Sequence, residues 1–150
     1  MYGANYAAYR QTDILTGDPK RLVILCYDGA IDSLNLAKAK YLSKDYMAKG
    51  NAVQKAMDII DYLREILDFD KGGEIAVQLD NIYNFMVRHI LKSDRERNVD
   101  GFQQVIKMLE ELKSAWEEVF YGVPGGNNVY VPQKELGSSS SAGVRSFEVK

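Results

Sequence analysis

The sequence predicts an all-α protein: an antiparallel up-down four-helix bundle with a short N-terminal segment and an irregular C-terminal tail. Four segments of about 20 residues carry apolar side chains at the spacing of one helix face. Short breaks join these segments, which places consecutive helices side by side in opposite directions. After residue 120 the helical period ends and Gly, Pro and Ser become frequent. We therefore divide the chain into an N-terminal segment at 1–15, a bundle at 16–120 and a tail at 121–150.

The composition excludes several classes of function. The 150 residues carry a formal net charge of −2, and Lys and Arg are scattered, so we expect no nucleic-acid partner. No run approaches the roughly 20 apolar residues that span a bilayer, so we expect no membrane insertion. Cys26 is the only cysteine, which makes an internal disulfide impossible. A reducing cytoplasm is therefore the expected compartment.

The first helix is expected from Asp18 to about Leu42. Asp18 serves as the N-cap and Pro19 takes the first helical position, where its missing N–H has no partner to lose. One broad apolar arc, which includes Cys26 and Ala30, is expected to face the core. A second apolar patch on another side of this helix consists of Leu22, Leu25 and Leu36. A helix with two apolar faces in so short a chain is expected to offer one of them to a partner.

The other three helices are expected at about 45–67, 74–92 and 99–120. A tight break at 68–73 ends in paired glycines, which terminate one helix and free the backbone to begin the next. Asn98 is the expected N-cap of the last helix. The apolar stripes of these helices predict the following core residues: Ile60, Leu63, Ile82, Leu109 and Trp116.

Several pieces of the sequence occur in the order and spacing of one known family. They are Tyr9 followed by Thr16, the Pro19 helix start, LVILCYDGA at 22–30, KAMDII at 55–60, LDFDKGGEIA at 67–76, LDNIYNFM at 79–86 and ELKSAW at 111–116. Over about residues 2–120 the chain thus resembles the flagellar export chaperones of the FliS type. Each piece alone is weak, whereas the ordered series is specific. The tail has no counterpart in the family, so its role inherits nothing from the resemblance.

The resemblance implies a four-helix protein of the bacterial cytosol without catalytic residues, metal or cofactor. Such chaperones bind the disordered C-terminal segment of flagellin one-to-one, prevent its premature polymerisation and deliver it to the flagellar type III export gate. The physical chemistry agrees with this role. A chain end that forms a filament core is amphipathic and self-associates when free, and grooves between helices of a bundle can hide its apolar faces.

Apolar side chains that miss the core stripes are the expected flagellin-binding groove, because a monomer gains nothing from leaving them in water. Tyr27 lies on the flank of its helix's main arc and joins them through the family signature. The expected groove consists of Leu22, Leu25, Tyr27, Leu36, Tyr62, Val77, Phe85 and Leu91. The alternative for each residue is that it fills a gap between helices.

The N-terminal segment is short of charge and rich in tyrosine. Tyr2, Tyr6 and Tyr9 are spaced four and three residues apart, so one turn-like segment could present three rings to a groove. Together with Ile14 they form the expected lid, which covers part of the client site in the empty protein. The tail lacks a helical period and the apolar surface to fold alone, and it is expected to be flexible.

Two alternatives to the chaperone interpretation stay open. The stretch from His89 to Ser93 resembles the motif of histidine phosphotransfer domains, which are also four-helix bundles, although Ser93 replaces the glycine of the motif. In that interpretation an exposed His89 imidazole accepts a phosphoryl group. The other alternative is an adaptor bundle for a different amphipathic helix. A ferritin-like di-iron bundle is excluded, because the chain holds one histidine and no Glu-x-x-His.

Overall fold

The structure, a computed structural model, describes residues 18–122 and confirms the all-α bundle over that range. Its four helices are α2 (Pro19–Leu42), α3 (Tyr46–Glu65), α4 (Phe69–Arg95) and α5 (Val99–Tyr121). No strand occurs between residues 18 and 122. None of these four helices combines the length and the apolar character that crossing a bilayer requires.

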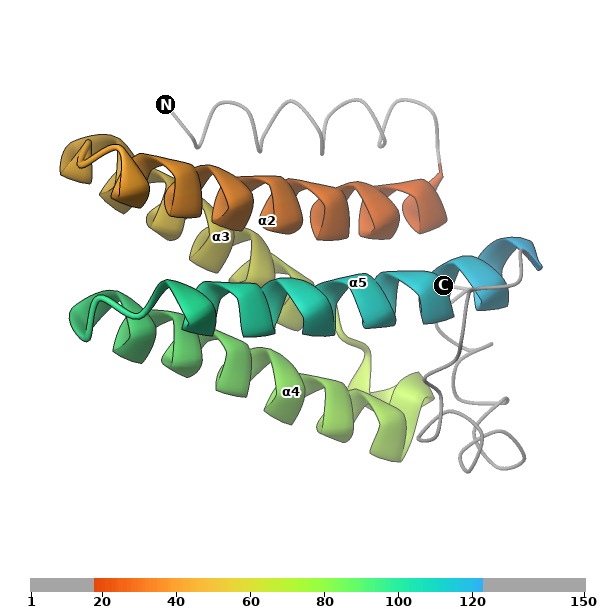
Figure 1. The fold of residues 1–150 in the computed structure, drawn as a ribbon. Helices are drawn as coiled ribbons and strands as arrows, with labels where there is room; N and C mark the ends of the chain where they lie inside the picture. Colours follow the sequence, from red (N-terminus) through yellow and green to blue (C-terminus); the bar gives the residue numbers. More distant parts are fainter. Residues whose placement is uncertain (1–17, 123–150) are drawn as a thin grey trace.

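The helices form a ring in which each runs antiparallel to the next (Figure 1). α2 packs on α3 and α5, and α4 packs on the same two helices, so α2 and α4 lie at opposite corners. The α2–α3 and α4–α5 turns consequently lie at one end of the bundle, which we call the two-turn end. The start of α2, the α3–α4 turn and the end of α5 meet at the opposite end.

A continuous apolar core fills the centre of the ring. Its members come from the inward faces of all four helices, and two tyrosines, Tyr27 and Tyr83, are its largest fully buried side chains. The predicted core residues Ile60, Leu63, Leu109 and Trp116 are buried, which confirms their assignment. Ile82 packs against the same core from a half-buried position.

Aspartates begin three of the four described helices. The Asp18, Asp45 and Asp68 carboxylates each accept hydrogen bonds from backbone N–H groups of the first turn, at 3.1 to 3.2 Å. These bonds satisfy donors that have no partner within the helix. Asn98 occupies the cap position of α5 as predicted, but its side chain makes no capping hydrogen bond.

The chain between α3 and α4 differs from the predicted break at 68–73. α4 already begins at Phe69, directly after the Asp68 cap, and its first turn runs into Gly73. Gly73 has φ 53° and ψ −127°, a conformation that essentially only glycine adopts, and it kinks the helix there. The longer part of α4 nevertheless starts at residue 74, after the non-helical Gly73, as expected. The unpredicted feature is the helical turn at 69–72, which Asp68 caps upstream of the paired glycines.

Candidate functional site

An apolar cavity of about 270 Å³ opens where α2 begins and α3 and α5 end. We call it the end cavity, and the end of the bundle that holds it the cavity end. Its lining residues are Pro19, Lys20, Leu22, Val23, Tyr62, Leu63, Ile66, Leu67, Tyr83, Trp116 and Phe120. Because nearly all of these side chains are apolar or aromatic, the cavity suits an apolar anchor of a partner and offers no arrangement for acid–base chemistry.

Three buried side chains beneath the end cavity are joined by hydrogen bonds. The Trp116 indole Nε1–H donates to the Tyr27 hydroxyl at 2.9 Å, and the Tyr27 and Tyr83 hydroxyls are hydrogen-bonded to each other. Burial raises the pKa of both tyrosines above the ordinary value of 10.0, so both hydroxyls stay neutral. This network links α2, α4 and α5, and it gives the floor of the cavity a fixed shape.

Crowded carboxylates lie beside the α3 wall of the end cavity. Burial raises the pKa of Asp61, and the charges of Asp58 and Glu65 raise it further, whereas the Arg64 guanidinium lowers it. Asp61 directly precedes Tyr62, which lines the cavity. A partner that carries basic groups next to its apolar anchor is therefore favoured at this end of the bundle.

The structure brings two predicted groove residues, Leu22 and Tyr62, together as walls of the end cavity. From Leu22 the apolar patch predicted on the first helix continues along α2 through half-buried Leu25 to exposed Leu36. We call these three leucines the α2 stripe. Leu22 itself is largely buried, because it packs into the main core cluster, so the expectation that it is exposed is wrong.

Tyr27 corrects the predicted groove most clearly. Its side chain has no exposed surface, so it cannot contact a partner in this structure. Tyr27 lies on a side of α2 that faces α4 and α5. There its hydroxyl is hydrogen-bonded to the Tyr83 hydroxyl and accepts a hydrogen bond from the Trp116 indole. A buried hydroxyl is tolerated when it is hydrogen-bonded, and the apolar pattern alone does not reveal such partners.

The remaining predicted groove residues lie on a different surface. Val77, Phe85 and Leu91 are exposed on α4, as their position off the core stripe indicates, and none of them lines the end cavity. We call them the α4 face. The predicted set therefore splits into the end cavity with the α2 stripe and the separate α4 face.

Some residues of the end cavity were not predicted as site residues. Val23, Ile66, Leu67 and Phe120 line it, although their sequence pattern assigns them to core-facing stripes. Ile66, Leu67 and Phe120 could have been identified by their position near the ends of α3 and α5. An apolar stripe that continues to the end of a helix extends beyond the neighbouring helices that cover it. The predicted lid residues Tyr2, Tyr6, Tyr9 and Ile14 lie outside the described residues.

The environment of His89 does not favour phosphoryl transfer. Its Nε2 is hydrogen-bonded to Gln104 Oε1 at 2.7 Å, and its ring stacks on Phe85 with 5.2 Å between the centroids. Ser93 is buried against α5, where a Cβ at Gly101 would overlap its side chain. Within residues 18–122, no three potential metal-ligating side chains come together.

Comparisons with known proteins cover the whole of this bundle. A family model described as "Flagellar protein FliS" matches residues 2–122. The flagellar secretion chaperone FliS of Salmonella typhimurium is 33% identical over 125 residues, which cover 79% of this chain and 93% of that relative. The relative of the same name in Vibrio cholerae is 33% identical over 108 residues, covering 72% and 79%. That of Bacillus subtilis is 23% identical over 113 residues, covering 75% and 84%.

Proposed function

Because the chain belongs to the family of flagellar protein FliS, a family of flagellar secretion chaperones and not of enzymes, we propose that its client is flagellin. In this proposal it binds the disordered C-terminal segment of flagellin one-to-one in the cytosol and prevents premature polymerisation. It then delivers the client to the flagellar type III export gate.

One observation carries the proposal: the end cavity lies at the head of the α2 stripe. Leu22 belongs to both, so a partner chain could insert an apolar side chain into the cavity and continue along α2 over Leu25 and Leu36. An amphipathic helix presents apolar residues every three or four positions and matches such a surface. We therefore assign Leu22, Leu25, Leu36 and Tyr62 to the primary client site.

The energetics of such a complex suit a temporary carrier. A disordered segment that folds on binding typically buries about 1,000–3,000 Å² and loses several kcal/mol to ordering of its chain. Burial on that scale requires more surface than the end cavity alone. We propose that a long client also reaches the α4 face at Val77, Phe85 and Leu91, which leaves large apolar side chains in water when the protein is empty.

The N-terminal lid belongs to the same proposal. With residues 1–15 over part of the primary client site, the empty chaperone would shield its own apolar residues, and the client would have to displace the lid. Deletion of residues 1–12 should then tighten the binding of flagellin, because the competing segment is gone. Unchanged affinity would refute the lid. The tail at 121–150 has no assigned role, and the family match ends at residue 122.

A titration with the flagellin C-terminal segment tests the proposed function. Calorimetry should give a one-to-one complex, and far-ultraviolet circular dichroism should show more helix in the mixture than in the sum of the separate components. The added helix is expected because the client folds as it binds. Absence of a complex at micromolar concentrations would contradict the proposal and favour an adaptor for a different helix.

A further inference from the structure

The two-turn end of the bundle carries the most exposed large apolar side chains of the described residues. At the α2–α3 turn, Leu42 is 73% exposed, Met47 is 79% exposed and Tyr46 is 54% exposed. Lys44 lies between them in the turn and is also exposed. We call these four residues the turn platform. It lies at the far end of α2 from the end cavity.

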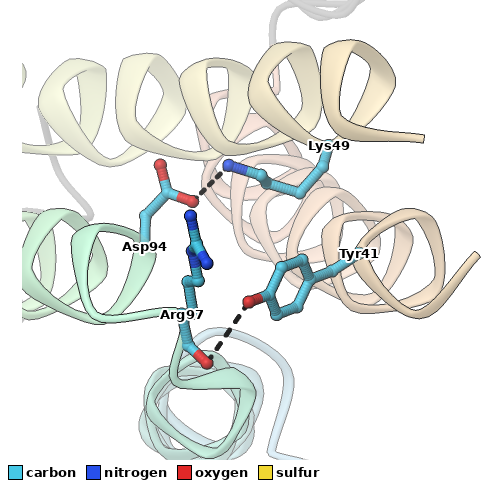
Figure 2. A network of polar contacts seen from close by, with 4 residues as sticks. All are labelled: Tyr41, Lys49, Asp94 and Arg97. Atoms are coloured by element: carbon cyan, nitrogen blue, oxygen red, sulfur yellow. Dashed lines mark hydrogen bonds and ion pairs between the residues drawn. The ribbon is translucent and has the colours of Figure 1, made fainter. Parts of the chain in front are cut away.

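Contacts between the two turns hold the turn platform in place (Figure 2). The Tyr41 hydroxyl donates to the backbone carbonyl oxygen of Arg97 at 3.5 Å, which joins the α2–α3 turn to the α4–α5 turn. Lys49 Nζ pairs with Asp94 Oδ1 at 2.5 Å and joins α3 to α4. The ring of Tyr41 also packs on the platform's Tyr46, with 5.8 Å between the centroids. A surface held in this way loses little freedom when a partner binds.

At each of the two turns, a residue other than glycine has a positive φ angle. Lys44 has φ 66° and Arg97 has φ 57°, conformations that glycine adopts most easily. Both positions hold long basic side chains, and Lys44 lies in the exposed turn itself. The Arg97 side chain points toward Asp94 (Figure 2), and Lys44 is the basic residue of the turn platform itself, so we assign the platform's positive charge to Lys44.

Charge is divided between the two ends of the bundle. The half that contains the two-turn end comprises residues 31–55 and 83–110, which hold ten Lys or Arg and six Asp or Glu. The half that contains the end cavity comprises residues 18–30, 56–82 and 111–122, which hold five Lys or Arg and twelve Asp or Glu. The nearly neutral total therefore conceals a positive end and a negative end. Such a field orients a charged partner along the bundle axis.

We propose that the turn platform is a second contact for the client and binds an acidic stretch that contains an apolar residue. This inference rests on the proposed function and adds a direction to it. The client lies along α2 with its more basic part at the end cavity and its more acidic part at the turn platform. The length is suitable, because α2 has 24 residues and a helix rises 1.5 Å per residue, so a client helix of similar length spans both sites.

Charge reversal at Lys44 tests the platform. Lys44→Glu should weaken binding of the flagellin C-terminal segment about fivefold at low salt and reduce its salt dependence, since a charge contact is replaced by repulsion. Lys107→Glu is the matched control, because Lys107 is exposed in the same positive half but lies on α5, outside the turn platform. It should change the affinity less than about twofold. Equal effects of the two variants, or none from Lys44→Glu, would overturn the proposal while leaving flagellin binding established.

A photo-crosslinking amino acid tests the direction of the client. Met47 tolerates it, because its side chain is almost entirely in solvent. A crosslinker at position 47 should react with an acidic stretch of the flagellin segment, and one at position 36 with a more central stretch. Crosslinks from position 47 to the most basic stretch would overturn the proposed direction. Failure of the unmodified protein to bind the segment at all would overturn the proposed function and this inference together.

Discussion

The Tyr27 hydroxyl lies where α2, α4 and α5 meet, with Trp116 donating to it and Tyr83 hydrogen-bonded beside it. Removing it by Tyr27→Phe takes one hydrogen bond away from each of two buried groups, the Tyr83 hydroxyl and the Trp116 indole. We expect the free energy of unfolding to fall by about 1–3 kcal/mol, measured by urea denaturation, because each of the two lost hydrogen bonds contributes about 0.5–1.5 kcal/mol. Tyr46→Phe, at an exposed tyrosine, should change it by less than about 0.5 kcal/mol. Equal effects would contradict the role of the network.

Asp61 makes the stability depend on pH in a defined direction. Burial raises the pKa of its carboxyl above 3.8, so the folded state binds this proton more tightly than the unfolded chain does. The contribution of the ionised carboxylate is therefore unfavourable at neutral pH, and it vanishes as the pH falls below the ordinary value. Asp61→Asn should raise the urea midpoint at pH 7 and leave it unchanged in strong acid. A lower midpoint at pH 7 would contradict this sign.

Individual residues also show which side chains' exposure can be predicted from the sequence and which cannot. Leu36 was correctly predicted to be exposed, because its position on the helix alone decides the outcome. The burial of Leu22 and Tyr27 was not predicted, because it depends on neighbours from other helices. A helical wheel gives the angle of a side chain, but the partner that covers it comes from the tertiary packing.

At the scale of the elements, the kink in α4 depends on one backbone conformation. Gly73→Ala should lower the free energy of unfolding by about 1–3 kcal/mol, since alanine is strained at φ 53° and ψ −127°. No atom lies within 4 Å of the added Cβ at either Gly73 or Gly50, so the two variants differ in backbone strain alone. Gly50→Ala, within α3, should stabilise the protein by about 0.5–1 kcal/mol. Urea denaturation of both variants checks this, and stabilisation by Gly73→Ala would contradict it.

The helices themselves could be predicted because their caps and apolar periods agree. Asp18 with Pro19 marks the start of α2, and Asn98 stands at the cap position of α5. The longer part of α4 could be placed after the glycine pair, whereas the helical turn before it at 69–72 could not, because a glycine pair can end a helix or bend it. That turn depends on the cap upstream, Asp68, which begins a helix before the glycines are reached.

At the scale of the whole molecule, the bundle could be predicted from its four helices and short turns, whereas the site could not. The end cavity exists because α2 begins beside the ends of α3 and α5, a meeting that no single helix encodes. The division of charge between the two ends likewise appears only when the antiparallel order is known. The sequence indicates that apolar residues are left over, and the fold determines where they gather.

The emission of Trp116 offers the most direct test of the claim that the client enters the end cavity. Trp116 is the only tryptophan and lines the cavity, so its fluorescence reports on that site alone. Titration with the flagellin C-terminal segment should change the emission to a saturating value. Tyr62→Asp should weaken the titration at least about tenfold by placing a charge in an apolar wall. Gln103→Asp, which adds the same charge on an exposed part of α5 outside the proposed client surfaces, should not. Binding that leaves the emission unchanged and is as tight with Tyr62→Asp as with the unmodified protein would contradict the account.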